Sequence, residues 1–293
     1  MLLQNEAEVN AQGGEYGNAL QAASSGCHHA VVKLLVENGA DVNLQGGEYG
    51  NALQAVCNGC HGPFRRLLIE KGADGHEAIV QLLLEKRADV NAQGGMYGNA
   101  LQAASHRGHE AIAAQLLLKG AHVNAQGGEY GNALQAASTG GHLALVELLI
   151  NKGADVNAQG GKYGNALQAA SNEGHKSIVK LLIHKGSDVN AQGGKYGNAL
   201  QAASYGGHEA LAKLLLDKGV DVNVKGGKYG NALQASSYGG YLAIVKLLIE
   251  KGADVNAQGG EYGSALHAAS NEGHEAIEKM LINNGALKVQ GPW

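Results

Sequence analysis

The stretch Tyr163-Gly164-Asn165-Ala166-Leu167-Gln168-Ala169 decides the fold, because it recurs along the chain at a nearly constant interval. Its copies open at Tyr16, Tyr49, Tyr97, Tyr130, Tyr163, Tyr196 and Tyr229, and an eighth copy, Tyr-Gly-Ser-Ala-Leu-His-Ala, opens at Tyr262. Every interval is 33 residues except that from Tyr49 to Tyr97, which is 48. A fixed period of this size is typical of a solenoid, in which each repeat buries its apolar face against its neighbours. We therefore predict a single array over residues 1–293 with about eight full repeats.

One repeat, residues 155–188, shows how each copy is built. Residues 155–164 are rich in turn formers and lack helical periodicity, so they are predicted to be an extended finger with a tight turn near its glycines. Asn165 is a good N-cap for a short helix of small residues over 166–172. A second, amphipathic helix begins after Gly174 and ends at Lys185-Gly186. The predicted unit is finger, helix, turn, helix.

This pattern resembles the ankyrin repeat, which has 33 residues, a hairpin turn and two helices. Gly174-His175, the following Ile-Val-x-Leu-Leu and the later Gly-Ala-Asp-Val-Asn match that family, and the resemblance covers essentially the whole chain. The first half departs from it, since Asn165-Ala166-Leu167-Gln168 stands where the family usually has Thr-Pro-Leu-His, and Tyr163 stands where its finger usually has Gly. The resemblance implies an all-α ankyrin-repeat solenoid of stacked helix-turn-helix units with β-hairpin fingers.

Two irregularities give further expectations. The first residues match the end of a second helix and the start of a finger, so the chain is expected to start in mid-repeat. The 48-residue interval is 18 short of two periods, which predicts one half-repeat near residues 71–87 without its finger and first helix. Helices over 64–70 and 79–85 would then follow each other, leaving a defect in the stack, exposed apolar surface and first repeats that are loosely coupled to the rest.

The overall composition argues against several classes of partner. The formal net charge is −4, which gives no electrostatic footprint for nucleic acid or for an anionic membrane. No stretch approaches 18 apolar residues, and the start lacks the basic and long apolar regions of a signal peptide. Three cysteines, none recurring in every copy, are too few for a disulfide framework and agree with a reducing compartment. We predict a cytoplasmic protein with no membrane association and no nucleic-acid partner.

Two sets of residues resemble chemical sites, but their register favours structural roles. Cys57, Cys60 and His61 have the Cys-x-x-Cys-His spacing of covalent haem attachment, yet Cys57 occupies an ordinary serine position and His61 an ordinary histidine position of the repeat. Eight histidines share one slot at the start of the second helix: His28, His61, His76, His109, His142, His175, His208 and His274. A residue that recurs at the same position of the repeat is expected to have a structural role rather than a catalytic or metal-binding one. We predict no catalytic residue, no metal site and no cofactor, and hence a protein that is not an enzyme.

The eight finger tyrosines are predicted to form a ladder with neighbours about 8 to 10 Å apart, the distance between packed helices. Such a ladder could stack the bases of a nucleic-acid strand, or each ring could pack on the adjacent finger and stiffen it. No basic stripe accompanies all eight tyrosines, which favours packing.

Positions that vary against this repeated background are the candidate binding site. Lys162, Lys195 and Lys228 stand just before the finger tyrosine, where other copies have Glu or Met. Tyr205 and Tyr238 stand at the predicted exposed end of the first helix, and Lys225 replaces the usual Gln. In the ankyrin family both places face the concave, ligand-binding surface, so these six residues suggest an interface for an acidic protein partner, although drift among exposed positions would give the same pattern.

The functional prediction is a monomeric, non-catalytic scaffold that binds a protein, or another domain of its parent chain, on its concave face. The alternative is a C-terminal sensor or regulatory fragment of a larger nucleotide-driven switch or enzyme whose catalytic module is absent. The phrase Gly-Asn-Ala-Leu-Gln-Ala-Ala-Ser resembles ankyrin arrays of fungal NACHT-type multidomain proteins, which supports this alternative.

Overall fold

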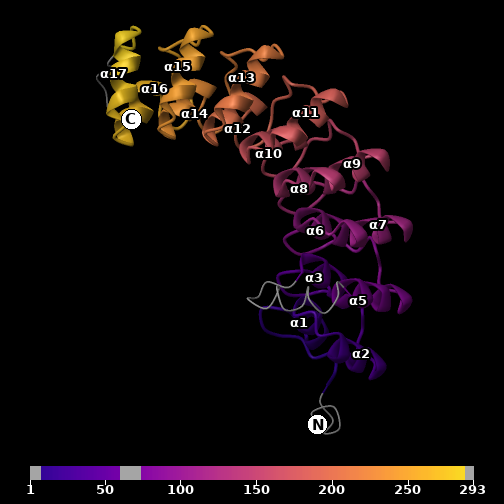
Figure 1. Ribbon diagram of the computed structural model, residues 1–293. Coiled ribbons are helices and arrows are strands. Elements are labelled where there is room, and N and C mark those ends of the chain that lie inside the picture. The colour runs from indigo at the N-terminus through magenta and orange to yellow at the C-terminus, as the bar shows by residue number, and fades with distance from the viewer. Residues whose placement is uncertain (1–7, 60–73, 288–293) are drawn as a thin grey trace. The chain divides into compact units, whose positions relative to one another are not determined.

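A computed structural model describes residues 8–59 and 74–287 of the chain. It divides into two compact units, residues 1–155 (unit 1) and residues 156–293 (unit 2), each built of paired helices (Figure 1). The helices of unit 1 are α1 (Ala19–Ser25), α2 (His29–Glu37), α3 (Ala52–Asn58), α5 (Asp74–Glu85), α6 (Ala100–Arg107), α7 (Glu110–Leu118), α8 (Ala133–Gly140) and α9 (Leu143–Asn151). Those of unit 2 are α10 (Ala166–Asn172), α11 (Lys176–His184), α12 (Ala199–Tyr205), α13 (Glu209–Asp217), α14 (Ala232–Tyr238), α15 (Leu242–Glu250), α16 (Ala265–Asn271) and α17 (Glu275–Asn283).

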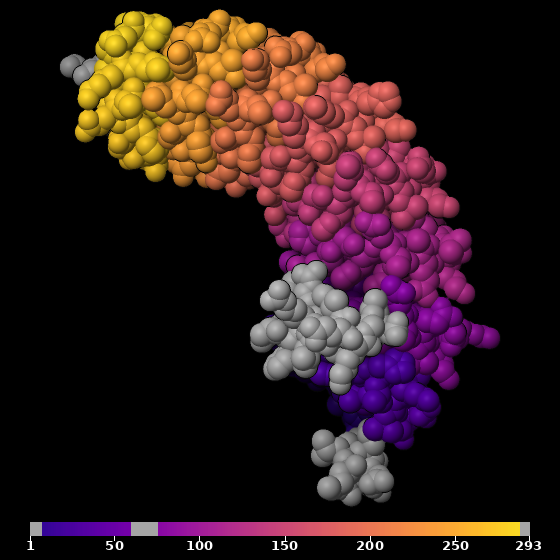
Figure 2. All heavy atoms as spheres, in the orientation of Figure 1, coloured from indigo at the N-terminus to yellow at the C-terminus, as the bar shows by residue number. Residues whose placement is uncertain are grey.

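The predicted first and second helices of the repeats in unit 2 are confirmed. In unit 2 the first helices α10, α12, α14 and α16 pack on one another in sequence, and each also packs on its own second helix. The N-cap Asn165 has an extended backbone, with φ −152°, and its side chain accepts a hydrogen bond from the backbone N–H of Gln168. The alanines of α10 are fully buried, so neighbouring first helices can approach closely. In the space-filling view, each repeat of unit 2 lies directly against the next (Figure 2).

Within each unit, buried glutamines connect first helices to the finger of the following repeat. Gln201 is 2% exposed, and its Nε2 donates to the carbonyl oxygens of Val224, at 3.0 Å, and of Gly230, at 3.2 Å. The equivalent glutamines that make the same kind of link are Gln21, Gln54, Gln102, Gln168 and Gln234. On the finger side, Asn157 Nδ2 donates to the carbonyl of Gly186 at 3.1 Å. The stacking is therefore specified by hydrogen bonds as well as by apolar packing.

The finger turn is present, but the β-hairpin of the prediction is not confirmed. All the finger turns except the last hold a single antiparallel bridge, such as Gly160 with Gly164 and Gly193 with Gly197, and no strand is found among residues 8–59 and 74–287. The tip is too short for more than one bridge.

The expected stacking defect is absent from the described residues of unit 1. Helix α3 packs directly on α6, and α5 packs on α2, α3 and α7 as a second helix would. Gln54 Nε2 reaches the carbonyl of Ala92 at 3.0 Å, and the N–H of Met96 donates to the carbonyl of Glu48 at 3.0 Å, as between regular neighbours. The helix expected over residues 64–70 lies outside the described residues. The long interval is thus better explained as one 33-residue repeat with 15 additional residues between its two helices.

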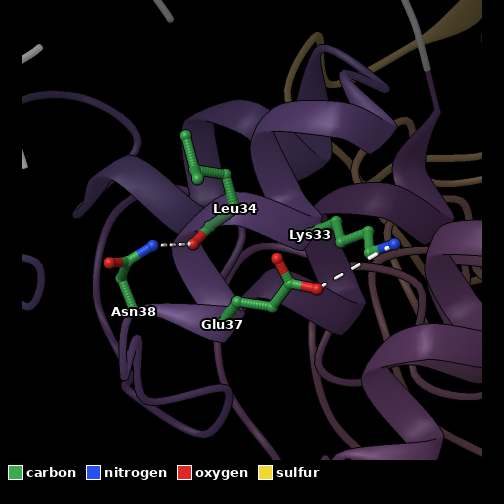
Figure 3. A network of polar contacts seen from close by, with 4 residues as sticks. All are labelled: Lys33, Leu34, Glu37 and Asn38. Atoms are coloured by element: carbon green, nitrogen blue, oxygen red, sulfur yellow. Dashed lines mark hydrogen bonds and ion pairs between the residues drawn. The ribbon is translucent and has the colours of Figure 1, made fainter.

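The second helices present exposed polar contacts on the side away from the fingers. In α2, the Nζ of Lys33 lies 3.9 Å from a carboxylate oxygen of Glu37, and Asn38 Nδ2 donates to the carbonyl of Leu34 at 2.8 Å (Figure 3). The ion pair is more than half exposed on both sides, so it contributes little to stability. The Leu34 carbonyl also accepts a hydrogen bond from the backbone N–H of Asn38 at 3.1 Å, so the side-chain bond is a second contact at the end of the helix.

Candidate functional site

The tyrosine ladder of unit 2 is closer-spaced than predicted. Ring centroids lie 6.1 Å apart for Tyr163 and Tyr196, 6.3 Å for Tyr196 and Tyr229, and 6.5 Å for Tyr229 and Tyr262. The prediction of about 8 to 10 Å was wrong because it used the distance between packed helices. The finger tips approach more closely, since the residues before the tyrosines are joined by backbone hydrogen bonds.

Those backbone bonds form a second ladder, one bond per repeat. The N–H of Lys195 donates to the carbonyl of Lys162 at 2.8 Å, that of Lys228 to Lys195 at 2.7 Å, and that of Glu261 to Lys228 at 2.9 Å. Equivalent residues of consecutive repeats therefore lie at the separation of paired strands. The consequence is that their side chains emerge in register, in one row.

Two further tyrosines fill the spaces between ladder rings. Tyr205 lies 4.9 Å from Tyr196 and 4.7 Å from Tyr229, and Tyr238 lies 5.1 Å from Tyr229 and 4.9 Å from Tyr262, between ring centroids. The expectation that Tyr205 and Tyr238 are exposed was wrong: both are half-buried, because the neighbouring rings cover them. The rings stack on one another, which supports the packing explanation of the ladder over base stacking.

The three lysines of the row lie over tyrosine rings. The Nζ atoms of Lys162, Lys195 and Lys228 are 4.9, 5.3 and 5.5 Å from the centroids of Tyr163, Tyr196 and Tyr229, respectively. The lysines are exposed while the tyrosines beneath them are at most 6% exposed. Cation–π attraction thus holds three ammonium groups above a rigid aromatic base.

The lysine row is followed by an acidic residue, and a further lysine lies in the same finger as its last member. Lys228 Nζ forms an ion pair of 3.0 Å with Glu261, the next residue of the row, and this hydrogen bond raises the pKa of Lys228. Lys225 lies three residues earlier in the same finger; it is exposed, and it makes no ion pair or hydrogen bond with the part of the chain that the structure describes. The structure thus brings together Lys162, Lys195, Lys228, Tyr205 and Tyr238, and leaves Lys225 beside them.

The interleaved rings were missed at the sequence level, although a signal was present. An aromatic residue nine positions after a finger tyrosine occurs only where it can insert between rings, as in Tyr196 with Tyr205 and Tyr229 with Tyr238. In unit 1, His106 has this position after Tyr97 and packs 4.5 Å from Tyr130. Arg107, ten positions after the finger tyrosine Tyr97, instead contacts its hydroxyl group: the Nη2 of Arg107 donates to the hydroxyl oxygen of Tyr97 at 3.0 Å. These residues stiffen the fingers.

The ladder should make stability sensitive to alkaline pH. Burial, and secondarily the neighbouring Tyr205, raises the pKa of Tyr196 to about 12. Because the ordinary value is about 10, the contribution of Tyr196 to stability is complete below pH 10 and is lost as the pH rises through 12. Denaturant unfolding of the full chain should show the midpoint falling over this window, and less steeply in a Tyr196→Phe variant. Equal pH dependence of the two proteins would contradict the assignment.

The described cysteines do not form a haem or metal site. Cys57 is a buried free thiol, and burial raises its pKa; Cys60 and His61 lie outside the described residues. Cys27 is disulfide-bonded, so the cysteines do not support a reducing compartment. Within the described ranges no group of three His, Cys, Asp or Glu side chains could hold a metal ion.

The repeated histidine links consecutive repeats. His208 Nε2 lies 2.8 Å from the carbonyl oxygen of Asn172, and His274 Nε2 lies 3.0 Å from that of Tyr238, in each case at the end of the preceding first helix. His142 makes the same contact with His106 at 3.0 Å. The histidine at this position of the repeat thus makes a contact between consecutive repeats, which is a structural role.

Comparison with known families places the chain in one of them. A family model for ankyrin repeats in three copies matches residues 73–160, 101–193, 134–226, 166–259 and 200–291, and a model for a single ankyrin repeat matches residues 18–47. The chain therefore belongs to the ankyrin-repeat family. Members of this family generally mediate protein–protein interaction and are typically non-catalytic. A search of curated proteins found no match.

The length and hydropathy of a helix decide whether it can span a membrane. None of the helices in residues 8–59 and 74–287 has the length and apolar character needed to span a membrane.

Proposed function

We propose that the protein is a non-catalytic scaffold that binds an acidic protein partner, or an acidic part of its own parent chain, on the inner face of unit 2. By inner face we mean the side formed by the finger tips and the first helices. The lysine row, Lys162, Lys195 and Lys228, supplies the charge, and Tyr205 and Tyr238 supply half-buried aromatic surface beside it. Lys225 extends the positive charge along one finger.

The observation that carries the proposal is the register of the three lysines. The Nζ of each lysine lies within 5.5 Å of a ring centroid, and the backbones of consecutive lysines are hydrogen-bonded, so the ammonium groups are partly positioned before a partner binds. Aromatic and basic groups held in this way are typical of residues that dominate binding energy.

The test is reversal of the row's charge. A Lys162→Glu, Lys195→Glu, Lys228→Glu triple variant of the full chain should bind its partner at least about tenfold more weakly, because each exposed ion pair is replaced by a repulsion. Partners are first captured from lysate of the source organism, and their affinity for each variant is then measured. Circular dichroism melting checks that the variant is folded.

A matched control changes equivalent lysines of the second helices. Lys180, Lys213 and Lys246 are exposed and recur every 33 residues on α11, α13 and α15, so Lys→Glu at all three alters the net charge by the same amount. This control should retain the partner. Loss of binding in the control but not in the row variant would move the site to the second helices and refute the proposal.

We propose as an alternative that the array senses or regulates a larger nucleotide-driven switch of the fungal NACHT type. The phrase Gly164-Asn165-Ala166-Leu167-Gln168-Ala169-Ala170-Ser171, which resembles ankyrin arrays of those proteins, supports this alternative. A phosphate-loop motif in the reading frame upstream of this sequence would favour this alternative, and the lysine row would then be a contact with the parent chain. Under either proposal the array is monomeric and free of cofactors.

A further inference from the structure

We propose that the lysine row binds an extended, strand-like acidic segment with a carboxylate at every second residue. This inference rests on the proposed function and adds the conformation and sequence pattern of the partner. It follows from the spacing of the row, from the register of its side chains and from the charges at its end.

The spacing of the row matches that of side chains on one face of a strand. The rings beneath the three lysines are 6.1 and 6.3 Å apart, and each Nζ lies within 5.5 Å of the centroid of its own ring, so the ammonium groups follow the spacing of the rings. In an extended chain, alternate side chains on one face are about 6.6–6.8 Å apart. An extended segment running along the row therefore places successive same-face carboxylates at successive ammonium groups.

A helical segment fits the row less well. Residues four apart in an α-helix are about 6.0 Å apart along the axis, but each step also rotates the side chain by about 40°. The third carboxylate is then turned about 80° away from the first. A row of three cations whose side chains emerge in register favours a ligand whose side chains stay on one face, which is a strand.

The charges of unit 2 also limit where such a segment can bind. Lys162, Lys195 and Lys228 are exposed and occupy consecutive positions of the row, so they attract an anionic ligand. Glu261 occupies the next row position and already pairs with Lys228. A fourth carboxylate at that position would meet a like charge, so the row fits three acidic residues and fixes the register of the ligand.

The inference is tested with synthetic peptides and the full-length chain. The probe is a fluorescent peptide in which glutamate and threonine alternate. A first control peptide has the same composition with all glutamates in one block, and a second has glutamate at every fourth residue of an alanine-rich helix. Anisotropy titrations at low ionic strength should give roughly tenfold tighter binding of the alternating peptide than of either control. That preference should vanish in the Lys162→Glu, Lys195→Glu, Lys228→Glu variant and persist in the control variant of the second helices.

Each other outcome has a defined meaning. Equal binding of all three peptides, lost in the row variant, would overturn the strand inference while leaving an acidic partner in place. Tighter binding of the helical peptide would also overturn it. Absence of saturable binding by the alternating peptide overturns the inference, and the capture experiment then decides the proposed function separately.

Discussion

Replacing Gly194 with alanine is expected to lower the free energy of unfolding by about 2–5 kcal/mol. Gly194 has φ +62°, a left-handed conformation that costs a residue with a side chain about 1–2 kcal/mol. A Cβ at this position would also overlap the backbone carbonyl of Tyr163, which cannot move without breaking the finger contact. The finger tips can approach closely because this position is a glycine.

A substitution at a second glycine distinguishes the cost of the left-handed backbone conformation from the cost of the steric overlap. Gly186 also has a positive φ, +90°, but a Cβ there meets nothing within 4 Å. Gly186→Ala should therefore cost only the conformational part, about 1–2 kcal/mol. Urea unfolding of both variants measures the difference. Equal losses for Gly194→Ala and Gly186→Ala would show that close approach of the fingers does not stabilise the stack.

Gln201→Glu should be the second severe change, with a loss of about 3–4 kcal/mol at pH 7. The substitution keeps the shape of the side chain but removes the amide that donates to Val224 and Gly230, and it points carboxylate oxygens at their carbonyls. A carboxyl in this buried position is expected to stay protonated when the protein is folded. Staying protonated costs about 1.4 kcal/mol for each pH unit above the ordinary value of about 4.3.

The sign of the pH dependence distinguishes this mechanism from simple loss of a contact. Because the folded pKa is raised, the variant should regain most of its stability below about pH 4.3 and lose it as the pH rises. Gln192→Glu is the control, since Gln192 is exposed and should change stability little at any pH. A loss for Gln201→Glu that is the same at pH 4 and pH 7 would refute the account.

The 33-residue period predicted the helices well because the residues that start, pack and end each helix recur from repeat to repeat. Asn165, the alanines of the first helix and Gly174 specify the cap, the close packing and the turn within one repeat, so no distant contact needs to be known. The candidate lysines and tyrosines could be named from the sequence, since variation in a repeated slot is visible without a structure, and their role in binding stays a prediction.

Features that depend on contacts between repeats were predicted less well. The ladder spacing was overestimated because the backbone bond from Lys195 to Lys162 has no signature in either residue type. Tyr205 was expected to be exposed because one repeat alone leaves it uncovered, and the next finger supplies the covering ring, Tyr229. The long interval after Tyr49 was taken for a lost half-repeat, because the direct packing of α3 on α6 is visible only in three dimensions.

The most direct test of the central claim is hydrogen exchange of the full chain with and without the acidic partner recovered by capture. Binding on the inner face predicts slower exchange at the finger tips around residues 193–197 and 226–230 and at the ends of α12 and α14, with α11, α13 and α15 unchanged. Protection confined to α11, α13 and α15, with the finger tips unchanged, would contradict the claim and place the partner on the opposite side.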